Sequence, residues 1–192
     1  PVCDAHPDVI CVEPGIGYGG GYWAQYKVFE SYALYHAYLG VDHLNKYNQN
    51  WYEVVIPNYF DVDDFTYDPT QKEDYFLFIG RVYAGKGVDI AIQTTKEIGA
   101  KLIIAGQGNL QDMGYSEIPS HVEVVGYADV EKRRQLMTRA KGAFTPTYYV
   151  EPFCGVHVEC FLSGTPVIST DWGAFTEFNL HGMTGYRCRT FE

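Results

Sequence analysis

Short apolar runs alternate with amphipathic stretches along most of the chain, and this alternation limits the folds that the chain can adopt. Seven runs have the length and the β-branched or aromatic content of buried strands: 8–13, 52–57, 75–80, 100–106, 122–126, 142–147 and 165–170. From residue 75 onward, helical patterns lie between several of them, at 88–98 and after Asp129, which we expect to cap a second helix. This order predicts an α/β fold with a doubly wound, Rossmann-like parallel sheet.

A polar, acidic and proline-bounded stretch from residue 57 to residue 75 separates these alternating elements from what precedes them. Such a composition is typical of a linker. We therefore expect two units, residues 1–57 and residues 58–192, of which the second contains the parallel sheet. The chain lacks an initiator Met and begins and ends close to strand-like runs, so we expect a fragment, truncated at both ends.

The charge balance and the cysteine pattern disfavour several classes of partner and site. The 192 residues carry 24 Asp and Glu against 14 Lys and Arg, a formal net charge of -10, which disfavours nucleic acid and anionic membrane surfaces. The five cysteines form no CxxC pair and no Cys/His spacing suited to zinc, so a cytoplasmic location is the simplest expectation. No apolar run approaches the roughly 20 residues of a membrane span.

The glycine-rich segment GIGYGG, residues 15–20, matches the G-x-G-x-x-G pattern of dinucleotide-binding folds and follows a strand-like run. The residues after it do not begin as an apolar helix, and we find no strand that ends in an acid about 20 residues further on. We therefore interpret the segment as a glycine-rich surface loop.

A second motif, EPFCGVHVECFL, places Glu151 and Glu159 around the start of an apolar helix expected at 155–162. The first turn of a helix exposes unpaired N–H groups and the positive end of the dipole, which suit a phosphate. Glu159 lies about 6 Å along the helix axis, where its carboxylate suits the two hydroxyls of a ribose. Glu151 precedes the helix and suits sugar hydroxyls. Two carboxylates that flank a diphosphate fit a nucleotide-sugar.

The alternative is that both glutamates are ordinary charges, either solvated or held in structural salt bridges. The helix that carries Glu159 is apolar on nearly all sides, so we expect this side chain to be buried, and a buried carboxylate without a partner is unfavourable. Burial favours a bound ligand but leaves a structural ion pair open.

Positive charge for a phosphate is available in FIGRVYAGKGVD, residues 78–89. Arg81 follows the carboxyl end of a predicted strand, where open α/β sheets bind their ligands, and Lys86 lies at the start of the next predicted helix. A lysine there opposes the helix dipole unless an anion is close. The alternative is a glycine-rich turn with two surface cations.

Four segments, FIGRVYAGKGVDIAI, IIAGQG, VEVVGYAD and EPFCGVHVECFLSGTPVISTDWGAFTE, together resemble the carboxyl-terminal domain of family 4 glycosyltransferases, which are retaining enzymes of the GT-B fold. The resemblance covers about residues 53–188 and includes the family's E-x7-E element at Glu151 and Glu159. VIPNYFD resembles the family's domain junction, with Asn58 at the turn. The resemblance implies that 58–192 is the donor-binding domain and that 1–57 is the end of the acceptor-side domain.

The resemblance also implies a role for each residue of the candidate site. Arg81 and Lys86 would bind the donor diphosphate, Glu159 the ribose and Glu151 the transferred sugar, so Glu151, Arg81 and Lys86 are the expected catalytic residues. The expected donor-binding set is Glu159, the backbone of Phe153, Cys154 and Gly155, and the turn glycines Gly80 and Gly106. Cys160 stands where the family usually has alanine, and DWGAFTE replaces its Gly-Gly-Xaa-Xaa-Glu pattern, which leaves the donor sugar open.

The expected reaction moves a sugar from a nucleoside diphosphate to a hydroxyl acceptor with retained anomeric configuration. Fixed positive groups would stabilise the leaving diphosphate, so we expect no metal and no other cofactor. The acceptor, whether a glycan, a lipid-linked sugar or a small molecule, is not indicated. A sugar-nucleotide epimerase or phosphorylase of the same fold, and a noncatalytic interaction domain, are the alternatives. His36 and His43 lie in an aromatic-rich helix pattern and are expected to be structural.

Overall fold

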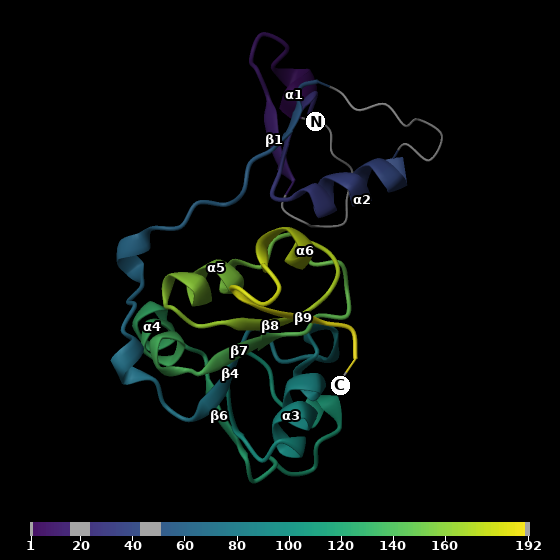
Figure 1. Cartoon of the computed structure of the whole chain (residues 1–192). Coiled ribbons are helices and arrows are strands. Elements are labelled where there is room, and N and C mark those ends of the chain that lie inside the picture. Colours follow the sequence, from purple (N-terminus) through teal and green to yellow (C-terminus); the bar gives the residue numbers. More distant parts are fainter. Residues whose placement is uncertain (1, 16–23, 43–50, 191–192) are drawn as a thin grey trace.

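The computed structural model describes residues 2–15, 24–42 and 51–190 and contains two parallel sheets (Figure 1). The smaller sheet has the strand order β1 (Val12–Gly15), β2 (Tyr26–Phe29), β3 (Glu53–Val55), and it is accompanied by helices α1 (Val2–Ala5) and α2 (Tyr32–Asp42). Among the described residues, no helix is long and apolar enough to cross a membrane.

The larger sheet has the strand order β6-β5-β4-β7-β8-β9, and every neighbouring pair is parallel. Its strands are β4 (Tyr75–Ile79), β5 (Lys101–Ala105), β6 (Val122–Gly126), β7 (Gly142–Thr145), β8 (Val167–Thr170) and β9 (Gly185–Cys188). The chain first moves outward from β4 to β6 and then returns to the other side of β4, so the order reverses between β4 and β7. This is the predicted doubly wound sheet, and the prediction of the fold class is confirmed.

Helices cover the larger sheet on both faces. These are α3 (Val88–Glu97), α4 (Val130–Arg139), α5 (Gly155–Leu162) and α6 (Phe175–Phe178). One core, which includes Leu77, Met137 and Cys160, lies between the sheet and helices α4 and α5. The other, which includes Phe78 and Val88, lies under α3, on the opposite face (Figure 1). Adjacent residues of β4 are therefore both buried, which explains why this strand is an unbroken apolar run.

The smaller sheet differs from expectation in two places. β1 begins at Val12 rather than at residue 8, because its pairing with β2 starts there, and Val9 and Ile10 lie outside the sheet and are exposed. β2 was not predicted. Its apolar pattern is interrupted by Lys27, which is buried in an ion pair with Glu53 of β3 (3.3 Å between Nζ and Oε1).

Two sequence predictions concern the residues around this sheet. The apolar face of α2 packs as expected, because the rings of Tyr35 and Tyr38 lie against Phe29 of β2. His36 is exposed on the same helix. Apart from Gly15, the glycine-rich segment lies outside the described residues, and so does His43.

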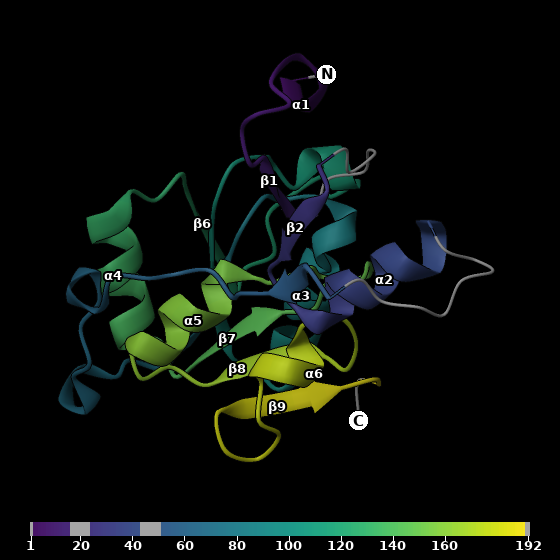
Figure 2. The same cartoon turned by 90° about the horizontal axis from the view of Figure 1, so that it is seen from above.

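The smaller sheet and α2 lie on the side of the larger unit that carries α5 and α6 (Figure 1, Figure 2). The carboxylate of Glu177, on α6, accepts hydrogen bonds from the N–H groups of Tyr32 and Ala33 at 2.9 and 2.6 Å and so caps the start of α2. Ser31 donates a hydrogen bond to the carbonyl of Pro152. The two sheets are thus joined by polar contacts, and the division into domains at residue 57 stays a prediction.

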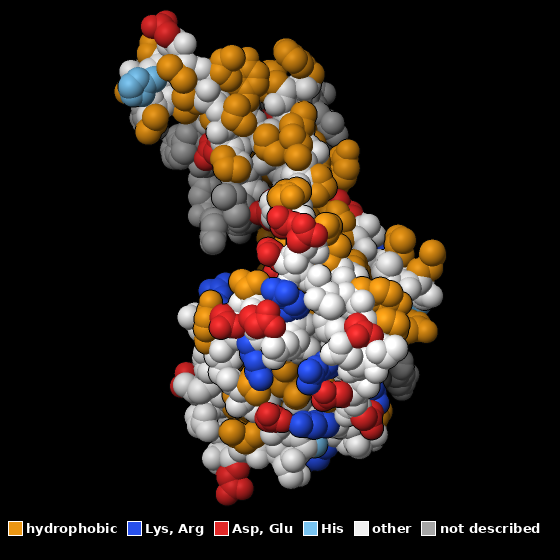
Figure 3. All heavy atoms as spheres, turned by 90° about the vertical axis from the view of Figure 1, so that its left-hand side faces the viewer, with side chains coloured by type: hydrophobic (Ala, Val, Ile, Leu, Met, Phe, Trp, Pro, Cys, Tyr) orange, Lys and Arg blue, Asp and Glu red, His pale blue; other side chains and the backbone are white. Residues whose placement is uncertain are grey.

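The face of the molecule in Figure 3 carries mostly hydrophobic side chains over the smaller unit and a mixture of positive and negative side chains over the larger one. Local groups of lysine and arginine exist on the larger unit, as an anion site requires.

Gly106 holds the ends of β4 and β5 close together. Its φ is +149°, and a Cβ atom built there would lie 1.8 Å from the carbonyl oxygen of Gly80. Gly99, at the end of α3, also has a positive φ of 65°, but a Cβ atom there would meet nothing within 4 Å. Gly106 thus combines a backbone conformation that L residues rarely adopt with a close contact, whereas Gly99 has a left-handed conformation and no close contact.

Replacing Gly106 with Ala should therefore destabilise the protein more than replacing Gly99 with Ala. The conformational effect at Gly99 should be about 1 to 2 kcal/mol. The clash at Gly106 adds to it and should bring the loss to about 3 kcal/mol or more. Urea unfolding of both variants measures the difference, and equal losses would show that the two strand ends separate freely.

Candidate active site

Two of the predicted residues meet where the strand order of the larger sheet reverses. Lys86 ends the short 3-10 turn Ala84–Lys86 that precedes α3, and Glu151 lies in the loop between β7 and α5. Lys86 Nζ and Glu151 Oε2 are 3.0 Å apart, and the two side chains are 20% and 8% exposed. Open α/β sheets bind ligands outside the strand ends at this reversal. The position thus fits a ligand site. In the structure the charges of Lys86 and Glu151 compensate each other.

Other groups around this ion pair restrict its chemistry. The ring of Tyr149 lies 5.0 Å from Lys86 Nζ. Burial, and then the neighbouring Glu151 carboxylate, raise the pKa of Tyr149 well above its usual range, so its hydroxyl stays protonated. Burial also raises the pKa of the Glu30 carboxyl. A hydrogen bond that Asn58 donates to this carboxyl lowers the pKa but is the smaller effect. The predicted junction residue Asn58 therefore orients a carboxylate near Glu151.

The residues just before α5 fix the backbone at the start of this helix. Cys154, the residue before the helix, has φ 66° and ψ 78°, and among the described residues other than glycine it is the one with a positive φ. Burial raises the pKa of its thiol to about 12, so the thiol is not ionised at neutral pH. The Phe153 ring is buried between Phe60 and Phe178. This aromatic contact fixes the backbone that was predicted to face the donor.

Glu159 is buried, as predicted, and pairs with Arg133 of α4. The side chains of Arg133 and Glu159 are 31% and 11% exposed. The structural ion pair that the sequence left open is therefore present. It does not exclude a ligand, because a carboxylate offers about four acceptor positions and one guanidinium does not occupy them all.

A cavity of about 270 Å³ lies at the carboxyl ends of β4, β5 and β6. Its lining includes Gly80, Arg81, Gly106, Gln107, Tyr127, Ala128, Arg133 and Val156. The side chain of Arg81 is exposed, with its guanidinium 5.5 Å from the centre of the Tyr83 ring. The predicted residues thus form two groups along one edge of the sheet. Gly80, Arg81 and Gly106 line the cavity, whereas Lys86, Glu151 and the start of α5 lie at the strand reversal.

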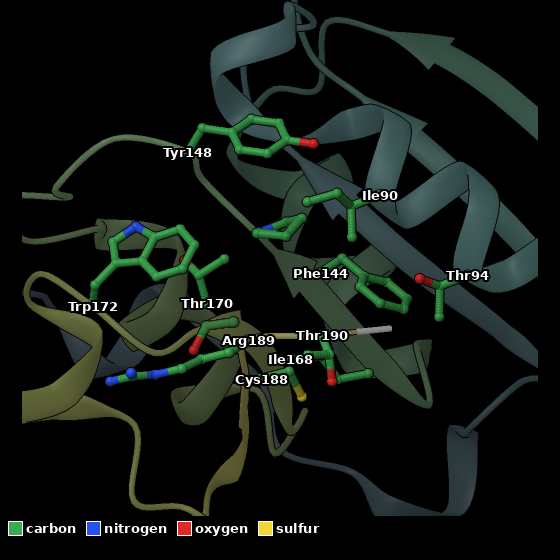
Figure 4. A pocket seen from close by; sticks show the side chains of 12 residues that line it. Ile90, Thr94, Phe144, Tyr148, Ile168, Thr170, Trp172, Cys188, Arg189 and Thr190 are labelled. Atoms are coloured by element: carbon green, nitrogen blue, oxygen red, sulfur yellow. The ribbon is translucent and has the colours of Figure 1, made fainter. Parts of the chain in front are cut away.

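A second cavity, of about 230 Å³, lies on the α3 face of the sheet (Figure 4). Its walls are mostly apolar and aromatic and include Ile90, Phe144, Ile168 and Trp172. None of the predicted site residues lines it. Arg189, the cation in its wall, pairs with Asp171 at 3.1 Å. Its lining therefore does not match the charge of a diphosphate.

Sequence reasoning missed several residues of this region. Arg133 could have been suspected, because a buried carboxylate requires a counter-charge and the helix after Asp129 carries three consecutive cations. Which of them faces α5 depends on how α4 is rotated against the sheet. Tyr127 and Tyr149 had no sequence signal, since each is placed by a loop. Glu177 ends the DWGAFTE segment, but its contact with the start of α2 depends on a distant helix.

Comparison with known proteins identifies the family. The family model described as "Glycosyl transferases group 1" matches residues 60–191. This chain belongs to the group 1 glycosyltransferases. The matched region contains the larger sheet and both groups of candidate site residues.

Two relatives in bacteria are moderately similar to this chain. The chain is 33% identical over 122 residues to the glycogen synthase of Mycobacterium tuberculosis, covering 58% of this chain and 29% of that protein. It is 24% identical over 159 residues to the lipopolysaccharide 1,2-N-acetylglucosaminetransferase of Salmonella typhimurium, covering 69% of this chain and 42% of that protein. The chain thus spans well under half the length of these relatives.

Solved structures show the same fold. Anabaena HepE in complex with UDP and glucose superposes with a TM-score of 0.72 at 20% identity, covering 85% of this chain and 49% of that one. AviGT4, a glycosyltransferase involved in avilamycin A biosynthesis, gives 0.64 at 26% identity, covering 79% and 46%. The group 1 chain described here therefore has the parallel α/β fold of these two structures.

The buried imidazole of His157 should make stability depend on pH. His157 lies on α5, its Nε2 is 2.6 Å from Thr145 Oγ1, and burial lowers its pKa to about 3. In the unfolded chain the pKa of this imidazole is about 6.5, so below that pH the unfolded chain binds a proton that the folded chain does not bind. The free energy of unfolding therefore decreases as the pH falls from about 6.5 toward 3. The stability difference between the wild type and His157→Gln should shrink by about 2 to 3 kcal/mol from pH 7.5 to pH 4.5. A pH-independent difference in urea unfolding would contradict this.

Proposed function

We propose that this chain is the donor-binding part of a retaining glycosyltransferase of family 4, which transfers a sugar from a nucleoside diphosphate to a hydroxyl acceptor. In this proposal Lys86 and Arg81 bind the diphosphate, Glu159 accepts hydrogen bonds from the ribose, and Glu151 contacts the transferred sugar. The observation that carries the proposal is the pairing of Lys86 with Glu151 at the reversal of the strand order, 3.0 Å apart.

The ion pair suggests how a donor would engage the site. Lys86 is held beside Glu151 in a largely buried position, where its interaction with an anion is stronger than in water. When a diphosphate binds the Lys86 ammonium group, the Glu151 carboxylate loses that partner. It can then accept hydrogen bonds from the sugar hydroxyls. As the glycosidic bond breaks, negative charge grows on the diphosphate, and Lys86 and Arg81 stabilise it.

The comparisons favour a first choice of donor. HepE was solved in complex with UDP-glucose, as well as with UDP and glucose. We therefore propose a UDP-sugar as the donor to test first. Residues 1–57 would belong to the acceptor-side domain and 58–192 to the donor-binding domain. A cytoplasmic location and catalysis without a metal remain predictions.

The donor site is tested by titrating the chain with UDP, GDP, ADP and their common sugar conjugates in calorimetry and thermal-shift experiments. We expect one nucleotide to bind saturably. Lys86→Ala and Glu159→Ala should each weaken it by at least about fivefold, because each removes a charge-assisted contact. Lys101→Ala is the matched control, since Lys101 begins β5 at the opposite edge and pairs with Glu123 on the surface. Unchanged affinity in the two site variants would remove these residues from the site.

The reaction class is tested by product analysis of the protein with the nucleotide-sugar that binds. A retaining transferase should give a product with the anomeric configuration of the donor, as measured by NMR spectroscopy. Sugar interconversion without an acceptor would indicate an epimerase, and consumption of inorganic phosphate would indicate a phosphorylase. Absence of binding to every nucleotide would favour a noncatalytic interaction domain.

A further inference from the structure

We propose that Arg133 is a positioning residue that holds the Glu159 carboxylate ready for the donor ribose. This inference rests on the proposed function, because it assigns a partner to the carboxylate that the proposal places on the ribose. It adds a residue that the E-x7-E pattern does not contain, and it gives the ion pair between α4 and α5 a role in ligand selection.

The position of Arg133 is fixed by the start of α4. Asp129 caps this helix by accepting a hydrogen bond from the N–H group of Lys132 at 2.8 Å, and the N–H group of Arg133 donates to the Asp129 carbonyl at 2.9 Å. Helices α4 and α5 cover the same face of the sheet and share its core. The Arg133 side chain leaves the first turn of α4, lines the cavity and reaches the buried Glu159.

The ion pair compensates the charge of Glu159. A carboxylate with a side chain only 11% exposed, on a helix with few polar neighbours, is unfavourable without a counter-charge. A guanidinium stays protonated at all relevant pH values. Arg133 contacts Oε2, and among the described residues no hydrogen bond reaches Oε1, so the acceptor positions of Oε1 remain for hydroxyl donors. Two ribose hydroxyls can then donate to an oriented carboxylate.

Arg133 also lines the cavity beside Glu159. The same cavity is lined by Arg81 and by Tyr127, which is 73% exposed. A nucleoside diphosphate offers both the charge and the hydroxyls for this set of side chains.

The next residue on α4 provides a matched control. Arg134 pairs with Glu131 one turn away at 3.2 Å, and the Glu131 side chain is 59% exposed. This is an ordinary surface ion pair within one helix. Replacing Arg134 removes the same charge from the same helix without touching Glu159.

The experiment compares Arg133→Leu, Arg133→Gln and Arg134→Leu with the wild type. The probes are the nucleoside diphosphate that binds the wild type, its 2′,3′-dideoxy analogue and inorganic pyrophosphate, with affinities measured by calorimetry. The wild type should prefer the ribose form over the dideoxy form by about tenfold or more, as expected for hydrogen bonds to a charged acceptor. In both Arg133 variants this preference should fall to about threefold or less, while pyrophosphate affinity changes by less than about threefold. Arg134→Leu should behave as the wild type does.

A conservative variant separates this role from a structural one. Arg133→Lys should restore part of the preference for ribose that Arg133→Leu and Arg133→Gln lose, because it returns a positive charge beside Glu159. Circular dichroism confirms that each variant is folded, and Arg133→Gln replaces Arg133→Leu if the latter is not.

The outcomes distinguish the two proposals. An unchanged ribose preference in the folded Arg133 variants would overturn the role of Arg133 and leave the proposed function intact. A uniform loss of affinity for all three probes would also overturn it, because Arg133 would then act on the phosphates. If the wild type binds no nucleoside diphosphate, the proposed function fails and the role of Arg133 fails with it.

Discussion

Burial of the parallel sheet on both faces is the constraint on which the rest of this structure depends. Helices must return over one face or the other between parallel strands, and every loop that follows a strand then lies at the same edge. Lys86 and Glu151 are 65 positions apart in the chain and belong to loops after β4 and β7, which are neighbours in the sheet. The site is thus a consequence of strand order.

The charges at this edge are arranged in pairs. Glu151 pairs with Lys86, and Glu159 pairs with Arg133, so each of these two carboxylates has a cation beside it. A buried charge without a partner would be strongly unfavourable, and such pairs avoid that penalty. A bound diphosphate would therefore exchange one partner of Lys86 for another, rather than add a charge to an empty site.

The smaller unit contacts the loop that carries Glu151. Ser31 donates to the Pro152 carbonyl, next to Glu151, and Glu177 of α6 caps the start of α2. The loop that carries the candidate sugar carboxylate is consequently joined to the smaller unit through Ser31. A change in the position of α2 would act directly on the backbone at residue 152.

The sequence by itself determined strands β4 to β8 of the larger sheet and helices α3, α4 and α5, because apolar runs and helical spacing reflect which residues are buried. It also indicated Arg81, Lys86, Glu151 and Glu159 as a candidate set, through their places at predicted strand ends and helix starts. Only the tertiary structure decided which of these charges meet, that Arg133 rather than its neighbours reaches Glu159, and that β2 forms around a buried lysine. Those outcomes depend on helix rotation and on partners far away in the chain, which local patterns do not encode.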